Sequence, residues 1–509
     1  DAAAGVDTPR GGVIIRPTDF NPERVILNDW ILDGPRLPDI HVGASITGAT
    51  VGVIDYSFSN FKLQVTSLGL VTSTLTREIA DAPEPGELAV ASFNVENLAP
   101  GDPQAKFDEL ADLIIGNLQA PDLIAVEEIQ DNNGAGGGGG VAADLTYAKL
   151  IEAIQTAGGP TYQFRQIDPV NGQDGGAPGG NIRQGFLFRT DRGLSFVDRP
   201  GGGSTTAVTV QPGVTGPRLS VSPGRIDPTN PAFTASRKPL VGEFRYGGRT
   251  LFIVANHFNS KGGDEPLFGR FQPPALVTEA QRIQQATVVA NFVDSVEALD
   301  PTAGVIVLGD LNDFEFSAPM AVLKAAGLKP LIETLPADER YTYVFQGNSQ
   351  SLDHIMMNAP LLSRPFEYDS VHVNAEFADQ ASDHDPQLVL VRPVFDFDGF
   401  FLPVDNPPTA NTVKAGQAIP VRFSLDGDQG LNVIAAGYPT SNQVPCAGGA
   451  GDPVEETDTG GSSGLHYDAA TDEYTYVWKT QKSWAGTCRV LTVKLSDGTI
   501  HEALFQFTR

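Results

Sequence analysis

The feature that most constrains the fold is a series of short apolar runs that each end in a polar cluster. Between about residues 87 and 395, strand-like runs such as Leu123–Val126 alternate with helix-like runs such as Lys106–Leu118. Continuous apolar runs are typical of buried strands covered by helices, so this order predicts an α/β domain. Six runs end in acidic, amide or imidazole residues: Ser92–Asn97, Asp122–Glu128, Ala255–Lys261, Leu308–Asp313, Ser351–Ile355 and Ser382–Pro386. Because neighbouring strand ends share one rim of a sheet, we expect these side chains to converge there.

The residue types in these clusters indicate divalent-cation chemistry. Carboxylate and amide oxygens hold hard cations such as Mg²⁺, and imidazoles beside them move protons near neutral pH. Glu128 follows a buried run and is expected at a strand end, where it can bind metal, while Glu127 is expected to point the opposite way. Asn94 can add a neutral oxygen. The clusters therefore predict a metal-dependent hydrolase acting on a phosphate ester.

Five further residues are candidates for the catalytic step. Asp310 and Asn312 lie two apart, so strand geometry puts them on one side, where they can orient a water and the phosphorane oxygens; an Asp-rich turn capping a strand is the alternative. His257 and His384 lie inside polar clusters, and Asp353 can bond one ring nitrogen of His384 and fix its tautomer. We interpret the remaining histidines as surface or packing residues: His41, His354, His372, His466 and His501.

In this order and spacing, the six clusters resemble the endonuclease/exonuclease/phosphatase superfamily, the fold of deoxyribonuclease I and abasic-site endonucleases. Within it, the chain resembles bacterial secreted nucleases. The resemblance covers about residues 87–395 and implies a four-layered α/β/β/α sandwich. It implies metal binding at Asn94, Glu128 and Asp383, with Mg²⁺ or Mn²⁺ as the cofactor and Ca²⁺ as an alternative.

The resemblance also assigns roles to the other candidates. Asp310 and Asn312 match the pair that orients nucleophile and phosphate, and His384, oriented by Asp353, matches one catalytic histidine. His257 matches the second, although no acidic partner for it can be placed. Two segments, Asn181–Arg189 and Ser236–Leu240, are similar to strands that contact phosphate, and they supply the substrate-binding candidates Asn181, Arg183, Arg189 and Arg237.

The flanks of this region suggest two further domains. Residues 1–86, with the run Gly52–Ser57, resemble an OB-like β domain, and residues 87–395 are expected to form the catalytic domain. Residues 396–509 contain alternating strand patterns and resemble an immunoglobulin-like β-sandwich. The two cysteines, Cys446 and Cys488, suggest a disulfide and an oxidising compartment, with two buried thiols as the alternative.

Charge limits the substrate. The chain has 62 acidic and 34 basic residues, a net charge of −28, which argues against a protein that coats nucleic acid through a basic surface. We expect a secreted (alternatively periplasmic or surface-bound) phosphodiesterase acting on DNA, with a small-molecule phosphodiesterase or phosphomonoesterase as the alternative. An adhesive β-module protein with an inactive core is the non-enzymatic alternative. No apolar run reaches the roughly 18–20 residues of a membrane span, and the oligomeric state stays open.

Overall fold

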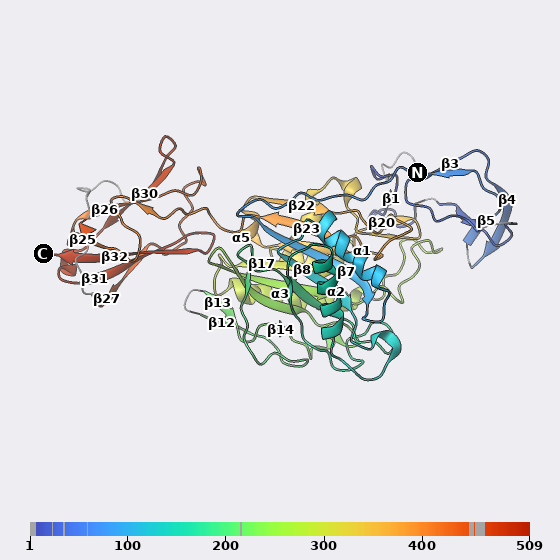
Figure 1. The fold of residues 1–509 in the computed structure, drawn as a ribbon, viewed down its shortest axis with the longest axis horizontal. Helices are drawn as coiled ribbons and strands as arrows, with labels where there is room; N and C mark the ends of the chain where they lie inside the picture. The colour runs from blue at the N-terminus through green and yellow to red at the C-terminus, as the bar shows by residue number, and fades with distance from the viewer. Residues whose placement is uncertain are drawn as a thin grey trace.

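A computed structural model describes residues 7–22, 24–33, 36–58, 60–213, 216–446, 452–453 and 464–509. Figure 1 shows an elongated molecule in which a central α/β core lies between an N-terminal β lobe and a C-terminal β module. The core contains two sheets. The first runs in the order β22 (Phe366–Ser370), β23 (Gln387–Val391), β7 (Leu88–Leu98), β8 (Leu123–Ile129), β10 (Arg183–Phe188) and β9 (Gln163–Arg165).

The second core sheet lies face to face with the first. Its strands run in the order β11 (Ser195–Phe196), β15 (Leu240–Tyr246), β16 (Arg249–His257), β17 (Gly304–Asp310), β21 (Asp353–Met357) and β18 (Lys329–Pro330), and β14 (Gly224–Arg225) pairs with β15. Apolar side chains of both sheets fill the space between them, including Val90 and Phe186 from the first sheet and Ile253 and Leu308 from the second. The runs predicted as buried strands are therefore strands.

Helices cover the outer face of each sheet. On the first sheet lie α1 (Gln104–Asp112), continued by a π-helical turn (Leu113–Asn117), and α2 (Asp144–Thr156). On the second lie α3 (Glu279–Glu297) and α4 (Ala318–Ala325), and the one-turn α5 (Ala359–Leu362) follows β21. The order helix, sheet, sheet, helix gives the four layers that the sequence predicts. Among the described residues, no helix is long and apolar enough to cross a membrane.

The N-terminal region divides between a lobe and the core. The lobe holds one sheet in the order β2 (Ile26–Asn28), β5 (Asn60–Ser67) and β4 (Val51–Ser57), and a second made of β3 (Ser45–Thr47) and β6 (Leu70–Thr72). In contrast, β1 (Val13–Ile14) pairs with β20 (Asn348–Gln350) of the core. The other partner of β20 is β19 (Tyr343–Phe345). The chain thus starts against the core before it forms the lobe.

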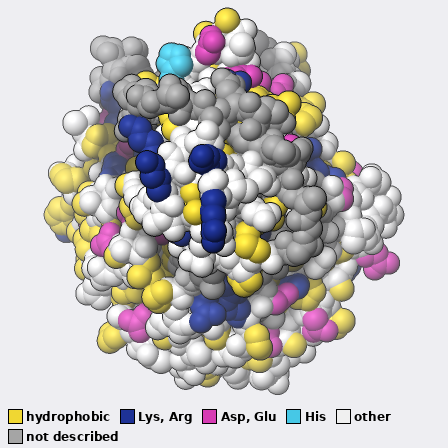
Figure 2. All heavy atoms as spheres, turned by 90° about the vertical axis from the view of Figure 1, so that its left-hand side faces the viewer, with side chains coloured by type: hydrophobic (Ala, Val, Ile, Leu, Met, Phe, Trp, Pro, Cys, Tyr) yellow, Lys and Arg dark blue, Asp and Glu magenta, His cyan; other side chains and the backbone are white. Residues whose placement is uncertain are grey.

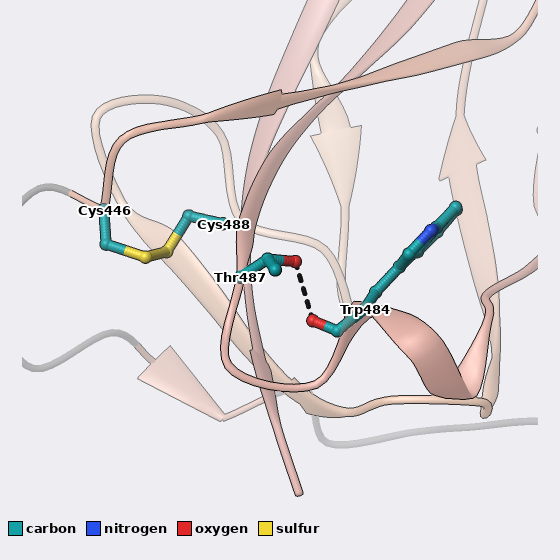
Figure 3. Close-up of a disulfide and its surroundings, with 4 residues drawn as sticks. All are labelled: Cys446, Trp484, Thr487 and Cys488. Carbon is teal, nitrogen blue, oxygen red and sulfur yellow. Dashed lines mark hydrogen bonds between the residues drawn. A yellow bond between two sulfur atoms is a disulfide. The ribbon is translucent and has the colours of Figure 1, made fainter.

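The C-terminal module is a sandwich of two sheets. One has the order β24 (Phe400–Phe401), β26 (Ala418–Phe423), β30 (Glu473–Lys479) and β29 (Leu465–Asp468); the other has β27 (Thr440–Val444), β31 (Cys488–Lys494), β32 (Ile500–Thr508), β25 (Ala410–Lys414) and β28 (Asp452–Pro453). Side chains such as Val421 and Phe505 meet between the sheets. A disulfide joins Cys446 to Cys488, as predicted, and ties the end of β27 to the start of β31 (Figure 3).

Candidate active site

The predicted polar clusters meet at one rim of the core, where strands of both sheets end. The parallel pair β7 and β8 brings Asn94 beside Glu127 in the first sheet. In the second, the parallel pair β16 and β17 brings His257 beside Asp310, and β21 places Asp353 opposite Asp310. These ends surround a cavity of about 720 Å³ lined by Glu128, His257, Asp310, Asn312, Asp383 and His384, among others.

Asp310 is the link between the two sheets. The side-chain amide of Asn94 donates to Asp310 Oδ2 at 3.3 Å, and the backbone and side-chain amides of Asn312 donate to Asp310 at 2.8 and 3.2 Å. Asn312 has a φ of 52°, so the chain turns sharply and returns its amide to Asp310. Burial, then the nearby Asp353 carboxylate, raises the pKa of Asp310 to about 7. The carboxylate and amide pair predicted from the sequence is thus assembled on one side of the cavity.

His384 and Asp353 form a buried pair. Nδ1 of His384 lies 2.7 Å from Asp353 Oδ2, and Thr342 Oγ1 donates to the same oxygen at 2.7 Å. Burial lowers the pKa of His384, but Asp353, Asp310 and Asp383 outweigh it and raise that pKa well above its usual value. Because Nδ1 is engaged, Nε2 is the ring nitrogen left for chemistry in the cavity. This is the arrangement that the sequence predicts for Asp353 and His384.

His257 lines the same cavity and has a different electrostatic environment. Its Nε2 lies 3.4 Å from Asp310 Oδ2 and 3.8 Å from Glu128 Oε1, while its Nδ1 has no hydrogen-bond partner among the described residues. Burial, then the Arg237 guanidinium, lowers the pKa of His257 well below its usual value. The carboxylates near this histidine are therefore Asp310 and Glu128, which the sequence did not identify as its partners.

The metal-ligand candidates lie around the same cavity. Glu128, whose φ of 62° marks the turn at the end of β8, accepts from the Asn97 backbone N–H at 3.0 Å. Asp383 is partly exposed, and its Oδ1 lies 3.9 Å from His384 Nε2. The side-chain oxygen Oδ1 of Asn94 accepts from the Glu96 N–H at 3.0 Å.

A second group of possible metal-ligand atoms was not predicted from the sequence as a metal site. One oxygen each of Asp310 and Asp353 and one ring nitrogen of His384 lie within 4.8 Å of one another. Since His384 Nδ1 already contacts Asp353, we interpret these three side chains as groups that transfer protons rather than as metal ligands. The cavity is nevertheless rich in carboxylates, and this donor chemistry fits a hard divalent cation.

Glu127 and Glu96 add to this excess of negative charge. As expected, Glu127 turns away from Glu128, but it turns into the space between the sheets, where it is fully buried. Burial, then Asp353 and Asp310, raises the pKa of Glu127 well above its usual value. Burial and Asp383 likewise raise the pKa of Glu96. Alternation along the strand gives the direction of Glu127, but only the packing of the second sheet shows that this direction leads towards Asp310.

Of the four predicted phosphate contacts, the structure brings only Arg237 into the cavity. Arg237 is buried, donates to the Phe258 carbonyl, and lines the cavity beside His257. Arg183 is also buried, but its guanidinium pairs with Asp168 at 2.8 Å. Arg189 lies at the other end of β10, beyond the Phe188–Leu123 pair, and pairs with Asp191.

Asn181 does not line the cavity and instead connects loops through hydrogen bonds. Its side-chain amide donates to Asp131 and to the Gly140 carbonyl, and its oxygen accepts from the Gly172 N–H. It therefore joins two glycine-rich stretches, Gly134–Gly140 and Gly172–Gly180. The second stretch also reaches the site, because Gly176 and Ala177 line the cavity. Arg183, Arg189 and Asn181 are thus correct as members of one strand region but not as residues facing the site.

Three residues carry no prediction from the sequence: Lys261 and Tyr343, which line the cavity, and the buried Thr342 behind Asp353. Thr342 supports Asp353, as described above, and Tyr343 lies 4.7 Å from the His384 ring, measured between centroids. Lys261 lines the cavity while its Nζ pairs with Asp313 at 3.0 Å. Lys261 belongs to the polar cluster Ala255–Lys261, so its charge could have identified it as a residue of the site. No pattern in the sequence distinguishes Thr342 or Tyr343.

Paired carboxylates, a histidine held by an aspartate and a buried arginine around one open cavity define a hydrolytic site for a phosphate ester. A family model described as "Endonuclease/Exonuclease/phosphatase family" matches residues 91–384. That match covers more than half of the chain, and the protein belongs to this family. Membership supports a phosphodiesterase or nuclease type of activity, and the enzymes of the family depend on divalent metals.

Other comparisons add little to this assignment. Residues 1–74 match a model described as a domain of unknown function, DUF8508, and no curated protein matches the chain.

Solved structures resemble this chain only weakly, and three of them serve as examples. Truncated TDP2 from Caenorhabditis elegans is 15% identical (TM-score 0.36; 60% of this chain and 97% of that chain covered). A family protein from Bacteroides thetaiotaomicron is 16% identical (0.37; 60% and 98%). D. rerio TDP2 in complex with a single-strand DNA product is 18% identical (0.37; 60% and 98%). Family membership rests on the family model rather than on these structures.

Proposed function

We propose that the protein is a divalent-metal-dependent endonuclease that cleaves DNA outside the cell. The observation that carries this proposal is the convergence of Glu128, His257, Asp310 and His384 around one open cavity. The disulfide between Cys446 and Cys488 supports an oxidising, extracellular location. We further propose three parts, an OB-like domain over 1–86, the catalytic domain over 87–395 and an immunoglobulin-like module over 396–509.

The residues divide the chemical work as follows. A divalent cation held by Glu128, Asp383 and the Asn94 oxygen would neutralise charge on the scissile phosphate. Asp310, held by the two amides of Asn312, positions the attacking water, and its pKa of about 7 allows it to take a proton near neutral pH.

The two histidines and Arg237 act on the phosphate. Nε2 of His384 exchanges a proton in the cavity while Asp353 holds the imidazolium. His257 and Arg237 line the same cavity, where Nε2 of His257 and the Arg237 guanidinium stabilise charge that develops on the phosphate oxygens.

A small phosphodiester or phosphomonoester is the second candidate substrate. It is favoured by the net charge of −28 and by the pairing of Arg183 with Asp168 and of Arg189 with Asp191, which leaves Arg237 as the arginine that lines the cavity. A small ester needs few cationic contacts, whereas a long polyanion is repelled by the overall field.

One parallel assay separates the candidates. Supercoiled plasmid DNA, RNA, bis-p-nitrophenyl phosphate and p-nitrophenyl phosphate are incubated with Mg²⁺, Mn²⁺ or Ca²⁺, and an Asp310→Asn variant purified in the same way reports contaminating nuclease. We expect nicked and then linear plasmid with the parent only. Rapid turnover of a nitrophenyl ester with intact plasmid would replace the endonuclease by the second candidate.

A further inference from the structure

The outer end of the C-terminal module carries a group of basic residues far from the cavity. We name this group the basic tip; it consists of Lys414, Lys479, Lys482, Arg489 and Arg509. In the view of Figure 2, which faces this end of the molecule, Lys and Arg side chains gather near the middle of the face, and Asp and Glu side chains lie mostly around its margin. The tip lies at the opposite side of the module from the catalytic core (Figure 1).

Strand register brings these residues together from separate parts of the chain. Lys414, at the end of β25, is level with Thr508 next to Arg509, and Lys479 pairs with Ala418. Hydrogen bonds close the tip: the Gly416 N–H donates to Thr480 Oγ1 at 3.0 Å, the Thr480 N–H to the Gln417 carbonyl at 3.1 Å, and the Gly486 N–H to the Phe507 carbonyl at 2.8 Å.

Lys482 and Arg489 are held by local packing. The Lys482 side chain packs against the backbone of Gly416. A Cβ atom at position 416 would stand 2.5 Å from Lys482 Cγ, and the φ of 90° also favours glycine, so a larger residue there would displace the lysine. The Arg489 guanidinium lies 4.2 Å from the Trp484 ring centroid and donates to Ser441. The disulfide partner Cys488 precedes Arg489, so the covalent bridge fixes this corner of the tip (Figure 3).

The segments that carry the tip cations lack acidic residues, although the neighbouring β28 places Asp452 level with Asn411 of β25. The segments 410–420, 475–494 and 503–509 contain no Asp or Glu. Lys494, at the other end of β31, pairs with Asp300 of the core at 2.7 Å, whereas Lys414, Lys479 and Lys482 are exposed and make no ion pair with any residue of the described ranges. In a chain of net charge −28, these residues are a local concentration of cations.

We propose that the basic tip binds the phosphate backbone of a nucleic acid, as a second binding site for the long substrate of the catalytic domain. This inference rests on the proposed function. A small ester cannot contact both the cavity and the tip, so the tip acts only on long substrates. The tip segments contribute none of the large exposed apolar side chains of the module, which are Leu402 and Leu431, so a membrane surface would find no apolar anchor there.

The expected strength follows from counterion release. If Lys414, Lys479 and Lys482 each neutralise one phosphate, they contribute roughly −2.7 to the slope of log affinity against log salt. That contribution corresponds to a roughly 40-fold loss of affinity between about 50 and 200 mM salt.

The test compares two triple variants in the full chain. K414Q/K479Q/K482Q removes the three exposed tip lysines, and the matched control R218Q/R245Q/K329Q removes three exposed cations of the core. Binding to plasmid-length duplex is measured across salt in the Asp310→Asn background, which prevents cleavage. We expect a slope shallower by roughly 2–3 for the tip variant only. With active protein, turnover of bis-p-nitrophenyl phosphate should be unchanged in both variants.

The possible results of these binding and cleavage measurements lead to different conclusions about the basic tip. An unchanged slope in the tip variant, or an equal change in the core control, overturns the nucleic-acid site at the tip. Loss of binding to phosphatidylserine vesicles with unchanged DNA binding overturns it in favour of a membrane surface. If the parent fails to cleave any DNA, the proposed function falls, while the binding measurement still decides the role of the tip. K414R/K479R/K482R, which keeps the charges, should retain the parental slope.

Discussion

Replacing Asp353 with Asn tests the histidine assignment most directly. The substitution keeps the shape of the side chain and a hydrogen-bond acceptor for Thr342, but it removes the charge beside His384 Nδ1. Both side chains of the pair are at most 8% exposed. At 2.7 Å and an effective dielectric constant of about 20, their gross attraction is about 6 kcal/mol. Without it, burial is opposed only by the more weakly acting Asp310 and Asp383, so the pKa of His384 falls.

We expect kcat to fall by about 10²–10⁴-fold, the range for a positioned acid–base group. This equals about 2.7–5.4 kcal/mol of transition-state stabilisation, which is less than the gross attraction because a neutral hydrogen bond can remain. Steady-state kinetics on plasmid and on bis-p-nitrophenyl phosphate measure the change, and thermal unfolding confirms the fold.

His384→Ala should lower kcat into the same range, and the double variant should be no slower than His384→Ala, because residues that act as a unit are not additive. Asp198→Asn, which breaks the exposed ion pair with Arg165, is the matched control and should leave kcat unchanged. Parental rates in Asp353→Asn, or additive losses in the double variant, would refute the pairing as the basis of catalysis.

Three further predictions concern the metal and the C-terminal module. Glu128→Ala should abolish Mg²⁺ or Mn²⁺ binding in calorimetry while Glu265→Gln, on the rim of the same cavity, should not; parental affinity in Glu128→Ala would contradict the ligand assignment. Reducing the Cys446–Cys488 bridge, which spans 42 positions, should destabilise the module by about 4 kcal/mol and leave turnover of small esters intact, and two free thiols in non-reducing peptide maps of native protein would contradict this. Burial lowers the pKa of His501 to about 4, so the unfolded chain binds this proton first and the module should lose about 1–2 kcal/mol between about pH 7 and pH 5. His501→Gln should remove that loss in pH-dependent unfolding, and an identical pH profile in the variant would exclude His501 as its cause.

The catalytic rim was predictable because its residues sit at strand ends. Period-two alternation correctly groups Asp310 with Asn312, and the buried run before Glu128 correctly places it at the end of β8. The Asp353–His384 pair was predicted as a contact and is one at 2.7 Å. The local pattern gives the position of each residue at a strand end, whereas the turn at Asn312, with a φ of 52°, and the meeting of Asp353 with His384 come from the tertiary structure.

Residues whose role depends on partners from other elements were not predictable in the same way. Arg183 and Arg189 belong to a strand that starts at the catalytic rim, but Asp168 and Asp191 engage their guanidinium groups elsewhere. The sequence does not show which carboxylate an arginine will meet. Similarly, β1 lies within residues 1–86, which the sequence predicts as one domain, whereas it pairs with β20 of the core.

The distribution of charge explains why a second binding site would matter for such an enzyme. The cavity collects carboxylates and repels a polyanion, and at physiological salt a charge acts over only about 8 Å, so cations at the distant tip cannot screen that repulsion. They can act only by holding the same DNA molecule, which raises its effective concentration at the cavity. The tip should therefore change KM for long DNA and leave kcat at saturation untouched, whereas Arg237, which lines the cavity, should affect long and short substrates alike. A loss of kcat in the tip variant would mean that the tip contributes to more than tethering.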